Sequence, residues 1–491
     1  MKKRFLWSLL VFSFILISSC TPKTLENCKG QECIDVCKQD FDECEAFCTA
    51  DKDKCPQEVI DWYEEVKSVL TKAPDEIPIA PKRGLPERPP FGQPDEEMLK
   101  RICKEETWPA DCNMIPVPQG VEMCKRCKSI FKNGCSGKGA VRFTSPPRRL
   151  EDIEMILPLG MMSEQHITPT DHQYHYTHNW NPKPTPSDLR DVLAPADGLI
   201  TLVQRLPSWT FYSGQGLEDY ELEIYHTCTF YTRYIHLLKL SSKIKNAIGD
   251  LAHTENVPVS IPVKAGEVLG GATALDFSVH DSEVTLKGFI IPDHYEGERW
   301  KIHTVDPYDY FNDPIRAELI GKTMRKEQPY GGKIDYDIDG KLVGNWFAEN
   351  SGGYSGAVPG TYGYWSNHLA ITYDAIDPSH IILSVGTFKF EGDDKGRQFG
   401  IKGNSPDPAT IDKNSGMVKY ELVGYDYKDD TGKTWDWFSY ASNLKSRNRD
   451  AVEGIVLVQM LEDRKIKFEA FPGKTASQVN EFTGNAKIYE R

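Results

Sequence analysis

Short runs of strand-forming residues, separated by turns, restrict the fold of this chain more than any other feature. From Asp152 onward Val, Ile, Leu, Tyr and Thr dominate the runs, and Gly, Pro and Asp occupy the turns between them. The first group of runs covers residues 156–159, 199–203, 220–225, 229–237 and 257–263. Short strands with turn signals between them are typical of barrels and sandwiches. We therefore expect residues 151–315 to form an antiparallel β domain.

A second group of strand-like runs follows from about residue 315. It covers residues 368–373, 380–385, 418–422, 451–460 and 466–471. We expect residues 316–491 to form a second antiparallel β domain, so the predicted fold class is mainly β. Many aromatic residues lie in this region, and they either fill the interior of a barrel or stack on sugars or peptides. They are Trp346, Phe347, Tyr354, Tyr362, Tyr364, Trp365, Trp435, Trp437, Phe438 and Tyr440.

The first twenty residues predict export. Positive charges in residues 1–4 precede an apolar run at 5–17, and Ser18-Ser19-Cys20 follows. This order is that of a secretory signal peptide, and the residues around Cys20 resemble a lipoprotein signal, in which that cysteine is lipidated. We expect a lipoprotein of the cell membrane or outer membrane that faces outside the cytoplasm. A plain secretory signal that is cleaved near the cysteine is the alternative.

Charge and hydropathy exclude two modes of association. The formal net charge is −14, from 58 Lys and Arg against 72 Asp and Glu. Such a chain repels a polyanion, so nucleic acid is not an expected partner. No segment after the leader reaches the length of about 18 apolar residues that a membrane span requires. The mature protein should therefore lie outside the bilayer, with a lipid as its anchor.

Cysteines predict a disulfide-joined module near the N-terminus. The chain has 13 cysteines, and an even number remains once Cys20 carries lipid, which in an exported chain indicates disulfides. Six of them lie in residues 21–72 as two pairs with one cysteine on either side, and the members of each pair are one helical turn apart. We favour a small α-helical hairpin, although six cysteines allow about fifteen pairings and a metal cluster is the alternative. The favoured disulfides are Cys33–Cys48, Cys37–Cys44 and Cys28–Cys55.

Two segments separate this hairpin from the β domains. Residues 73–100 are rich in proline and charge, which favours an extended spacer. Residues 101–150 contain five cysteines and few apolar residues, so this module depends on disulfides for its shape. Because five is odd, one of these cysteines is expected to pair with Cys228. The five are Cys103, Cys112, Cys124, Cys127 and Cys135.

Histidines and aspartates in the first β domain are the candidate metal-binding and catalytic residues of this sequence. They are His166, Asp171, His172, His226, His236 and Asp276. Four segments around them follow the order of a known family, namely residues 192–200, 225–226, 234–237 and 263–270. Through these segments, residues 152 to about 312 resemble the lysostaphin-type, or LytM-like, zinc peptidases, whose core is a duplicated hybrid motif of antiparallel β-sheet.

The resemblance implies a zinc site and peptide-bond hydrolysis. Three protein ligands, from an early His-x-x-x-Asp element and a late His-x-His element, leave a fourth position for water, whose pKa zinc lowers. Nearby histidines then position that water. Zn²⁺ is thus the implied cofactor, and a cell-wall or envelope peptide or glycan is the implied ligand. The residues that match these roles are, for the metal, His166, Asp171, His172 and Asp276 and, for catalysis, His236 and His226.

The sequence departs from the family pattern in both elements. Asp171 follows His166 by five residues, and its neighbour His172 points the opposite way on an extended strand, so only one of the two should reach a metal. The late element has Ala274 where the family has a catalytic histidine, and Asp276 where it has a ligand histidine. Aspartate can bind zinc, but alanine transfers no proton. Two functions therefore stay open: a zinc-dependent endopeptidase, or an inactive module that binds an envelope ligand or activates a partner enzyme.

Overall fold

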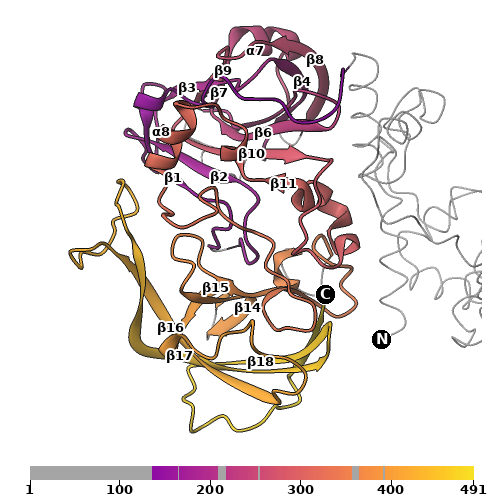
Figure 1. Cartoon of the computed structure of the whole chain (residues 1–491), viewed down its shortest axis with the longest axis vertical. Coiled ribbons are helices and arrows are strands. Elements are labelled where there is room, and N and C mark those ends of the chain that lie inside the picture. The colour runs from indigo at the N-terminus through magenta and orange to yellow at the C-terminus, as the bar shows by residue number, and fades with distance from the viewer. Residues whose placement is uncertain (1–134, 164, 208–216, 253–254, 357–363, 391–392) are drawn as a thin grey trace, which may run out of the picture. The chain divides into compact units, whose positions relative to one another are not determined.

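The computed structural model of the chain describes residues 135–491, except 164, 208–216, 253–254, 357–363 and 391–392 (Figure 1). All described residues belong to one of the two compact units into which the chain divides. The predicted leader, the six-cysteine hairpin with its three disulfides, and the proline-rich spacer lie outside the described residues. Within the described ranges, no helix is long and apolar enough to cross a membrane.

An antiparallel eight-stranded sheet forms the first β domain, here called the sheet domain (Figure 1). Its strands lie in the order β1-β2-β10-β6-β5-β4-β8, and β11 pairs with β10. The bounds are Ile153–Leu157 (β1), Gln173–Thr177 (β2), Gly198–Arg205 (β4), Tyr220–Tyr225 (β5), Phe230–Leu237 (β6), Asn256–Val263 (β8), Ala274–Asp281 (β10) and Thr304–Val305 (β11).

A three-stranded sheet and short helices complete this domain. The small sheet has the order β3-β9-β7, with bounds Arg190–Leu193 (β3), Val268–Ala272 (β9) and Lys239–Leu240 (β7). The α-helices are Ser242–Ile248 (α7) and Ile315–Lys322 (α8). The 3-10 helices are Leu150–Asp152 (η4), Pro292–His303 (η5) and Pro307–Asp309 (η6).

Strand β10, near the middle of the sheet, explains where the polar side chains lie. All eight of its residues are buried. Leu275, Phe277 and Val279 pack into the main apolar core of the domain. Because successive side chains of a strand point to opposite faces, Ala274 and Asp276 face the other side of the sheet. The sequence thus builds a sheet with one apolar face and one buried polar face.

The second β domain is a closed antiparallel barrel whose eight strands follow one another in sequence order, with β12 pairing β19 (Figure 1, orange to yellow). Its strands are Gly344–Ala348 (β12), His368–Tyr373 (β13), Ile381–Phe390 (β14), Asp393–Ile401 (β15), Met417–Lys428 (β16), Lys445–Glu462 (β17), Lys465–Pro472 (β18) and Lys487–Glu490 (β19). Two 3-10 helices, Tyr364–Asn367 (η7) and Lys402–Asn404 (η8), lie between strands. The prediction of two mainly antiparallel β domains is therefore confirmed.

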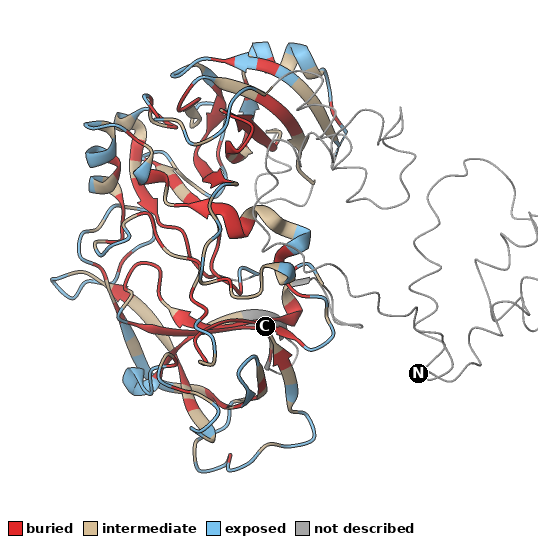
Figure 2. Cartoon of the chain, turned by 45° about the vertical axis from the view of Figure 1, so that its right-hand side comes forward, coloured by how far each residue is buried: buried red, intermediate tan, exposed pale blue. Residues whose placement is uncertain are grey.

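Apolar side chains fill the barrel interior, and Figure 2 shows its strands largely buried while the connecting loops are exposed. Trp346 is fully buried, and the guanidinium carbon of Arg491 lies 4.0 Å from the centre of its ring. Arg491 also donates to the carbonyl of Val343 and pairs with Asp337. Arg491, which directly follows β19, therefore connects the last strand of the barrel to the first strand.

A disulfide and an apolar cluster connect segments that are distant in sequence. Cys135 and Cys228 form a disulfide, which confirms the prediction that one cysteine of the second group pairs with Cys228. The cluster joins Met155 and Leu157 of the sheet domain to Tyr427 and Trp435 of the barrel.

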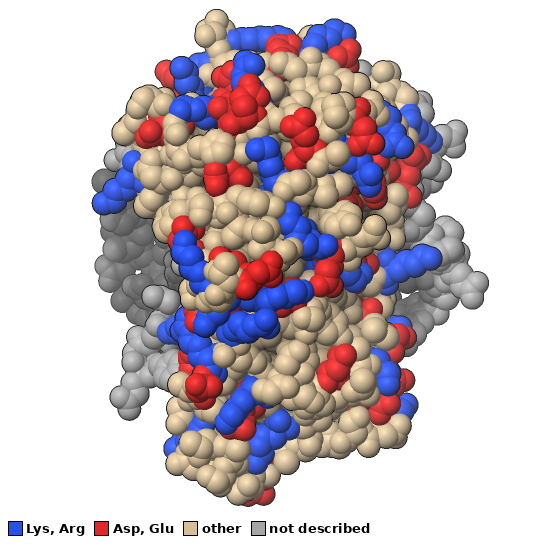
Figure 3. Space-filling view, turned by 60° about the vertical axis from the view of Figure 1, so that its left-hand side comes forward, with Lys and Arg blue, Asp and Glu red and all other residues tan. Residues whose placement is uncertain are grey.

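Acidic and basic side chains are interspersed on the face drawn in Figure 3, and a band of Lys and Arg across its middle is bordered by Asp and Glu. Opposite charges at close range cancel much of each other's field. This face therefore resembles an ordinary mixed protein surface more than the continuous basic stripe that nucleic acid requires.

Candidate functional site

Strands β2 and β10 bring a histidine and an aspartate together on the polar face of the sheet. His172 immediately precedes β2, and Asp276 lies on β10 opposite Tyr174 of β2. Nε2 of His172 is 3.4 Å from Oδ2 of Asp276, and both side chains are about nine-tenths buried. The two residues that the sequence placed in separate metal-binding elements are thus neighbours across two strands.

His236 joins this pair because strand β6 bulges at its end. The register between β5 and β6 shifts between Tyr220, which pairs with Leu237, and Glu221, which pairs with Ile235, so His236 is the additional residue. Its φ of 68° lies in the left-handed region, which residues with a Cβ rarely adopt. A bulge of this kind re-aims a side chain, and Nε2 of His236 lies 3.6 Å from Oδ2 of Asp276.

Each of the two histidines also faces a second carboxylate through its other ring nitrogen. Nδ1 of His172 is 3.0 Å from Oδ1 of Asp171. Nδ1 of His236 is 2.9 Å from Oδ2 of Asp219, a buried residue that directly precedes β5. Asp276 thus lies between the two imidazoles, and the second ring nitrogen of each imidazole contacts another carboxylate. These residues, Asp171, His172, Asp219, His236 and Asp276, are called the His–Asp cluster below.

Helix η5 anchors Asp171 at the edge of the cluster. The indole Nε1 of Trp300 donates a 2.8 Å hydrogen bond to Oδ2 of Asp171, and Nζ of Lys301 lies 3.5 Å from the same oxygen. The guanidinium carbon of Arg233 in turn stands 4.3 Å from the centre of the Trp300 ring. Asp171 therefore contacts η5 through one carboxylate oxygen and His172 through the other.

The charges of the cluster are arranged to keep His236 protonated. Burial opposes the charged imidazole, but Asp276 and the hydrogen bond to Asp219 outweigh it and raise the pKa of His236 to about 9. Burial would likewise raise the pKa of Asp171, yet Lys301 and His172 hold it well below its usual value. The geometry is thus that of a buried ion-pair network at neutral pH.

Ala274 lies on the same face of β10 as Asp276, at the position where the family resemblance implies a catalytic histidine. Its side chain is 5 % exposed and packs with Leu238 in a small apolar cluster. Tyr176 and Trp180 border this cluster. The surroundings of this position are therefore apolar, and the residue itself offers no group that transfers a proton.

The donor set was tested against the zinc site that the resemblance implies. Among the residues that the structure describes, no group of three or more His, Cys, Asp or Glu side chains is placed to hold a metal ion. Of the implied ligands, Asp171 accepts from Trp300 and lies 3.5 Å from Lys301, Asp276 faces His172, and the ring of His166 is centred 5.7 Å from that of His172. The residues do not fit the group in this arrangement, and we derive no step through zinc.

Not all of the predicted site residues come together. His166 is exposed at the rim of the cluster, with its ring centre 5.7 Å from that of His172. His226 lies at the other end of the β5–β6 hairpin, because it follows Tyr225, whereas His236 is near Tyr220. Its ring nitrogens contact the carbonyl of Asp197 and the hydroxyl of Thr232. His226 therefore has a local structural role and is not brought to the other predicted residues.

Two further histidines, His175 and His178, lie in and just after strand β2. His175 points to the opposite, apolar face, where its ring packs edge-on against Phe277, and burial lowers its pKa to about 3. His178 is exposed and pairs with Glu154. Neither joins the cluster, because His175 on β2 faces the apolar side of the sheet, and His178, beyond the end of β2, pairs with Glu154.

Sequence reasoning missed the residues that orient the cluster. Trp300 and Lys301 hold Asp171 from helix η5, which is distant in sequence, and Asp219 holds His236 from the start of the neighbouring strand of the β5–β6 hairpin. Only Asp219, an acidic residue at the start of a predicted strand, could have been considered, and its partner depends on the bulge in β6. The alternation of a regular strand does not reveal that bulge.

Comparisons with known proteins give little further information. No protein-family model matches the sequence, and no curated protein matches it. Among solved structures, the chain is similar to one described as "Structure of the SpoIIQ-SpoIIIAH pore forming complex", with 11% sequence identity and a TM-score of 0.22. The match covers 36% of this chain and 96% of that chain. At this score the likeness assigns no family, so function is argued from the residues of the site.

Proposed function

We propose that residues 152–312 act as a LytM-like binding module of the cell envelope, which holds a peptide ligand and does not cleave it. The position of Ala274 carries this proposal. Peptide hydrolysis needs a group that transfers protons beside the attacked carbonyl, and the resemblance implies a histidine at this position. In its place is a buried methyl group that packs on Leu238.

The ion pairs around Asp276 support the same conclusion. A general base must offer a lone pair, and His236 with a pKa of about 9 is protonated at neutral pH. Its two N–H groups point to Asp219 and Asp276. The residue that the resemblance implies as catalytic is therefore engaged in ion pairs that connect the central strands β5, β6 and β10. His236, whose side chain is 25 % exposed, and the exposed His166 beside the cluster can still contact the polar groups of a peptide.

The proposed location of the protein follows from the predicted lipoprotein signal peptide. A lipid on Cys20 would hold the module on the outer side of the membrane, within reach of envelope peptides. Labelling with a radioactive fatty acid is expected to mark the wild-type protein and not the Cys20→Ser variant. Equal labelling of both would remove the anchor from the proposal.

Hydrolysis is tested on the purified full-length protein with added zinc and insoluble cell-wall peptidoglycan, and released fragments are identified by mass spectrometry. We expect no fragments from the wild type. The double variant Ala274→His/Asp276→His restores both family histidines, and its folding is checked by circular dichroism. Zinc-dependent cleavage by the wild type would overturn the proposal.

Binding is tested by co-sedimentation with the same peptidoglycan. His166 is exposed beside His172, so His166→Ala removes a group that a ligand can reach. We expect this variant to sediment less than the wild type. His178→Ala is the matched control, because it removes another exposed histidine that lies outside the cluster. Failure of the wild type to sediment, or equal loss in both variants, would contradict a binding role for the cluster.

A further inference from the structure

Lys301 of helix η5 is a buried cation beside the His–Asp cluster. Its side chain is 3 % exposed, and Nζ lies 3.5 Å from Oδ2 of Asp171. A buried ammonium group destabilises a protein unless an opposite charge lies close to it. Asp171 supplies this charge through one oxygen, and its other oxygen lies 3.0 Å from Nδ1 of His172. A displacement of Lys301 would therefore act on His172 through the carboxylate between them.

The barrel contacts Lys301 from another side. Nζ of Lys301 lies 4.7 Å from the ring centre of Tyr354, a buried residue in the loop after β12. An ammonium group over an aromatic face is attracted to it, most strongly where water is excluded. The carbonyl of Tyr354 accepts a 2.7 Å hydrogen bond from Nε2 of His368, the first residue of β13. The barrel thus determines where this ring lies.

The same part of the barrel also holds the first half of η5. The backbone N–H of Tyr354 donates a 2.7 Å hydrogen bond to the carbonyl of His294. Nδ2 of Asn345, on β12, donates a 3.0 Å hydrogen bond to the hydroxyl of Tyr295. Both His294 and Tyr295 belong to η5. The first half of this helix is therefore fixed to the barrel, and its second half carries Lys301.

We propose that Lys301 is a positioning residue of the His–Asp cluster and that the barrel, through Tyr354, sets the geometry in which the cluster binds a peptide. The contacts run without a gap from the ring of Tyr354 to the ammonium of Lys301 and the carboxylate of Asp171. Coupling between distant parts of a protein is carried by such chains of packed and charged side chains. This inference rests on the proposed peptide binding at the cluster and adds its dependence on the barrel.

Replacing Lys301 by methionine tests the positioning role, because it keeps an unbranched apolar side chain and removes the charge. The indole N–H of Trp300 donates to Asp171 at 2.8 Å, so its NMR resonance reports on that carboxylate. The resonance is assigned by its absence in Trp300→Phe. We expect Lys301→Met to shift this resonance and to weaken co-sedimentation with peptidoglycan by about three- to tenfold. Lys301→Arg restores a cation and should recover most of the binding.

Two results would overturn the positioning role of Lys301. One is an unshifted Trp300 resonance in a Lys301→Met protein that is folded by circular dichroism. The other is a loss of binding in Lys301→Arg as large as that in Lys301→Met, because charge would then not matter. Lys333→Met is the matched control, since Lys333 pairs with Asp335 outside the cluster, and it should leave the resonance and the binding unchanged.

Replacing Tyr354 by leucine tests the role of the barrel and leaves every charge in place. If Lys301→Met does not fold, this variant decides. We expect it to shift the Trp300 resonance and to weaken binding, whereas Tyr354→Phe keeps the ring and should behave like the wild type. Tyr336→Leu is the control, because Tyr336 is a buried tyrosine beside a different lysine, Lys333. A folded Tyr354→Leu without either change, or equal effects of Tyr336→Leu, would overturn the role of the barrel.

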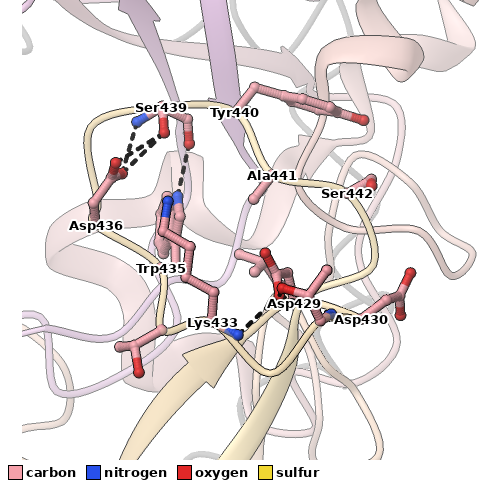
Figure 4. A pocket seen from close by; sticks show the side chains of 12 residues that line it. Asp429, Asp430, Lys433, Trp435, Asp436, Ser439, Tyr440, Ala441 and Ser442 are labelled. Atoms are coloured by element: carbon pink, nitrogen blue, oxygen red, sulfur yellow. Dashed lines mark hydrogen bonds between the residues drawn. The ribbon is translucent and has the colours of Figure 1, made fainter.

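The loop between β16 and β17 offers the barrel a different way to affect binding. It contains a pocket of about 450 Å³ (Figure 4), whose lining residues belong neither to η5 nor to the His–Asp cluster. A peptide held in this pocket would make binding depend on the barrel directly. Lys433 lines the pocket, and we expect Lys433→Met to bind like the wild type. A loss of binding as large as that in Tyr354→Leu would overturn the proposal.

The Trp300 resonance separates failure of this inference from failure of the proposed peptide binding. It is measured without ligand, so it reports on the contact between Lys301 and Asp171 in any case. A wild type that does not sediment with peptidoglycan, with the resonance shifted in Lys301→Met and Tyr354→Leu, would refute the peptide binding and support the positioning. A wild type that binds, with no change in either variant, would refute this inference alone.

Discussion

Replacing Asp276 by asparagine tests the ion-pair network most sharply, because it removes one charge and little volume. Asp276 is the carboxylate that bridges His172 and His236, at 3.4 Å and 3.6 Å. The amide can still accept a hydrogen bond, so packing is kept. What changes is the electrostatic support of the protonated His236. We expect the variant to fold and to be less stable at neutral and mildly acidic pH.

The size of the effect follows from the pKa of His236. It is about 9 in the folded chain against 6.5 for an ordinary histidine, and this difference of about 2.5 corresponds to about 3 kcal/mol. Asp219 shares the effect, so Asp276→Asn should cost roughly 1–2 kcal/mol. Because the folded-state pKa is the higher one, this stabilisation is fully present below pH 6.5 and is lost as the pH rises through about 9.

The assay has two parts. Histidine proton resonances are titrated by NMR, and the signal of His236 is assigned by its absence in His236→Asn, since asparagine tolerates the positive φ of this position. Stability to denaturant is then compared at pH 6 and pH 10. Asp191→Asn is the control, because it removes an aspartate from an exposed ion pair with Arg149 and should change stability by less than about 0.5 kcal/mol. A pKa of His236 near 6.5, or equal stability of Asp276→Asn and wild type at both pH values, would refute the reasoning.

Three further predictions concern metal, disulfide and barrel. After equilibration with zinc and removal of excess, elemental analysis of the full-length protein should find well under one equivalent, whereas one equivalent that is lost in His172→Gln would show that the cluster rearranges around a metal. Joint replacement of Cys135 and Cys228 by serine opens a loop whose ends are 93 residues apart, and should lower the free energy of unfolding by about 2–5 kcal/mol; an unchanged denaturation midpoint would contradict this. Trp346→Ala removes a fully buried side chain of the barrel and should lower the free energy of unfolding by about 3–5 kcal/mol. Trp437→Ala at the exposed loop between β16 and β17 should leave thermal stability unchanged. Equal effects of the two substitutions would be inconsistent with the described burial.

The regular part of the fold could be predicted from the sequence because strands with one buried face alternate strictly. The predicted run at 220–225 coincides with β5, and that at 368–373 coincides with β13. Strand β17 begins six residues earlier than the run predicted at 451, because residues 445–450 are polar and extend the hairpin beyond the barrel. No alternation of apolar residues marks such a solvent-exposed extension.

The site was predictable only in part. The sequence predicts that Asp171 and His172 point opposite ways on a strand, but both precede β2 and contact each other at 3.0 Å, with η5 and Asp276 as their further partners. Alternation alone would place His236 on the face opposite to Ile235, the partner of Asp276 across β6 and β10. The bulge reverses this, and its cause is the pairing of β5 with β6, which no local pattern of residues records.

The central claim is that the sheet domain binds an envelope peptide without hydrolysing it, and one measurement tests it directly. Soluble peptidoglycan fragments that carry stem peptides are incubated with the full-length protein and zinc, the complex is isolated, and the bound material is identified by mass spectrometry. The account predicts intact fragments in the complex at every time point. Fragments cleaved within the stem peptide, which accumulate in the wild type and not in Asp276→Asn, would contradict it.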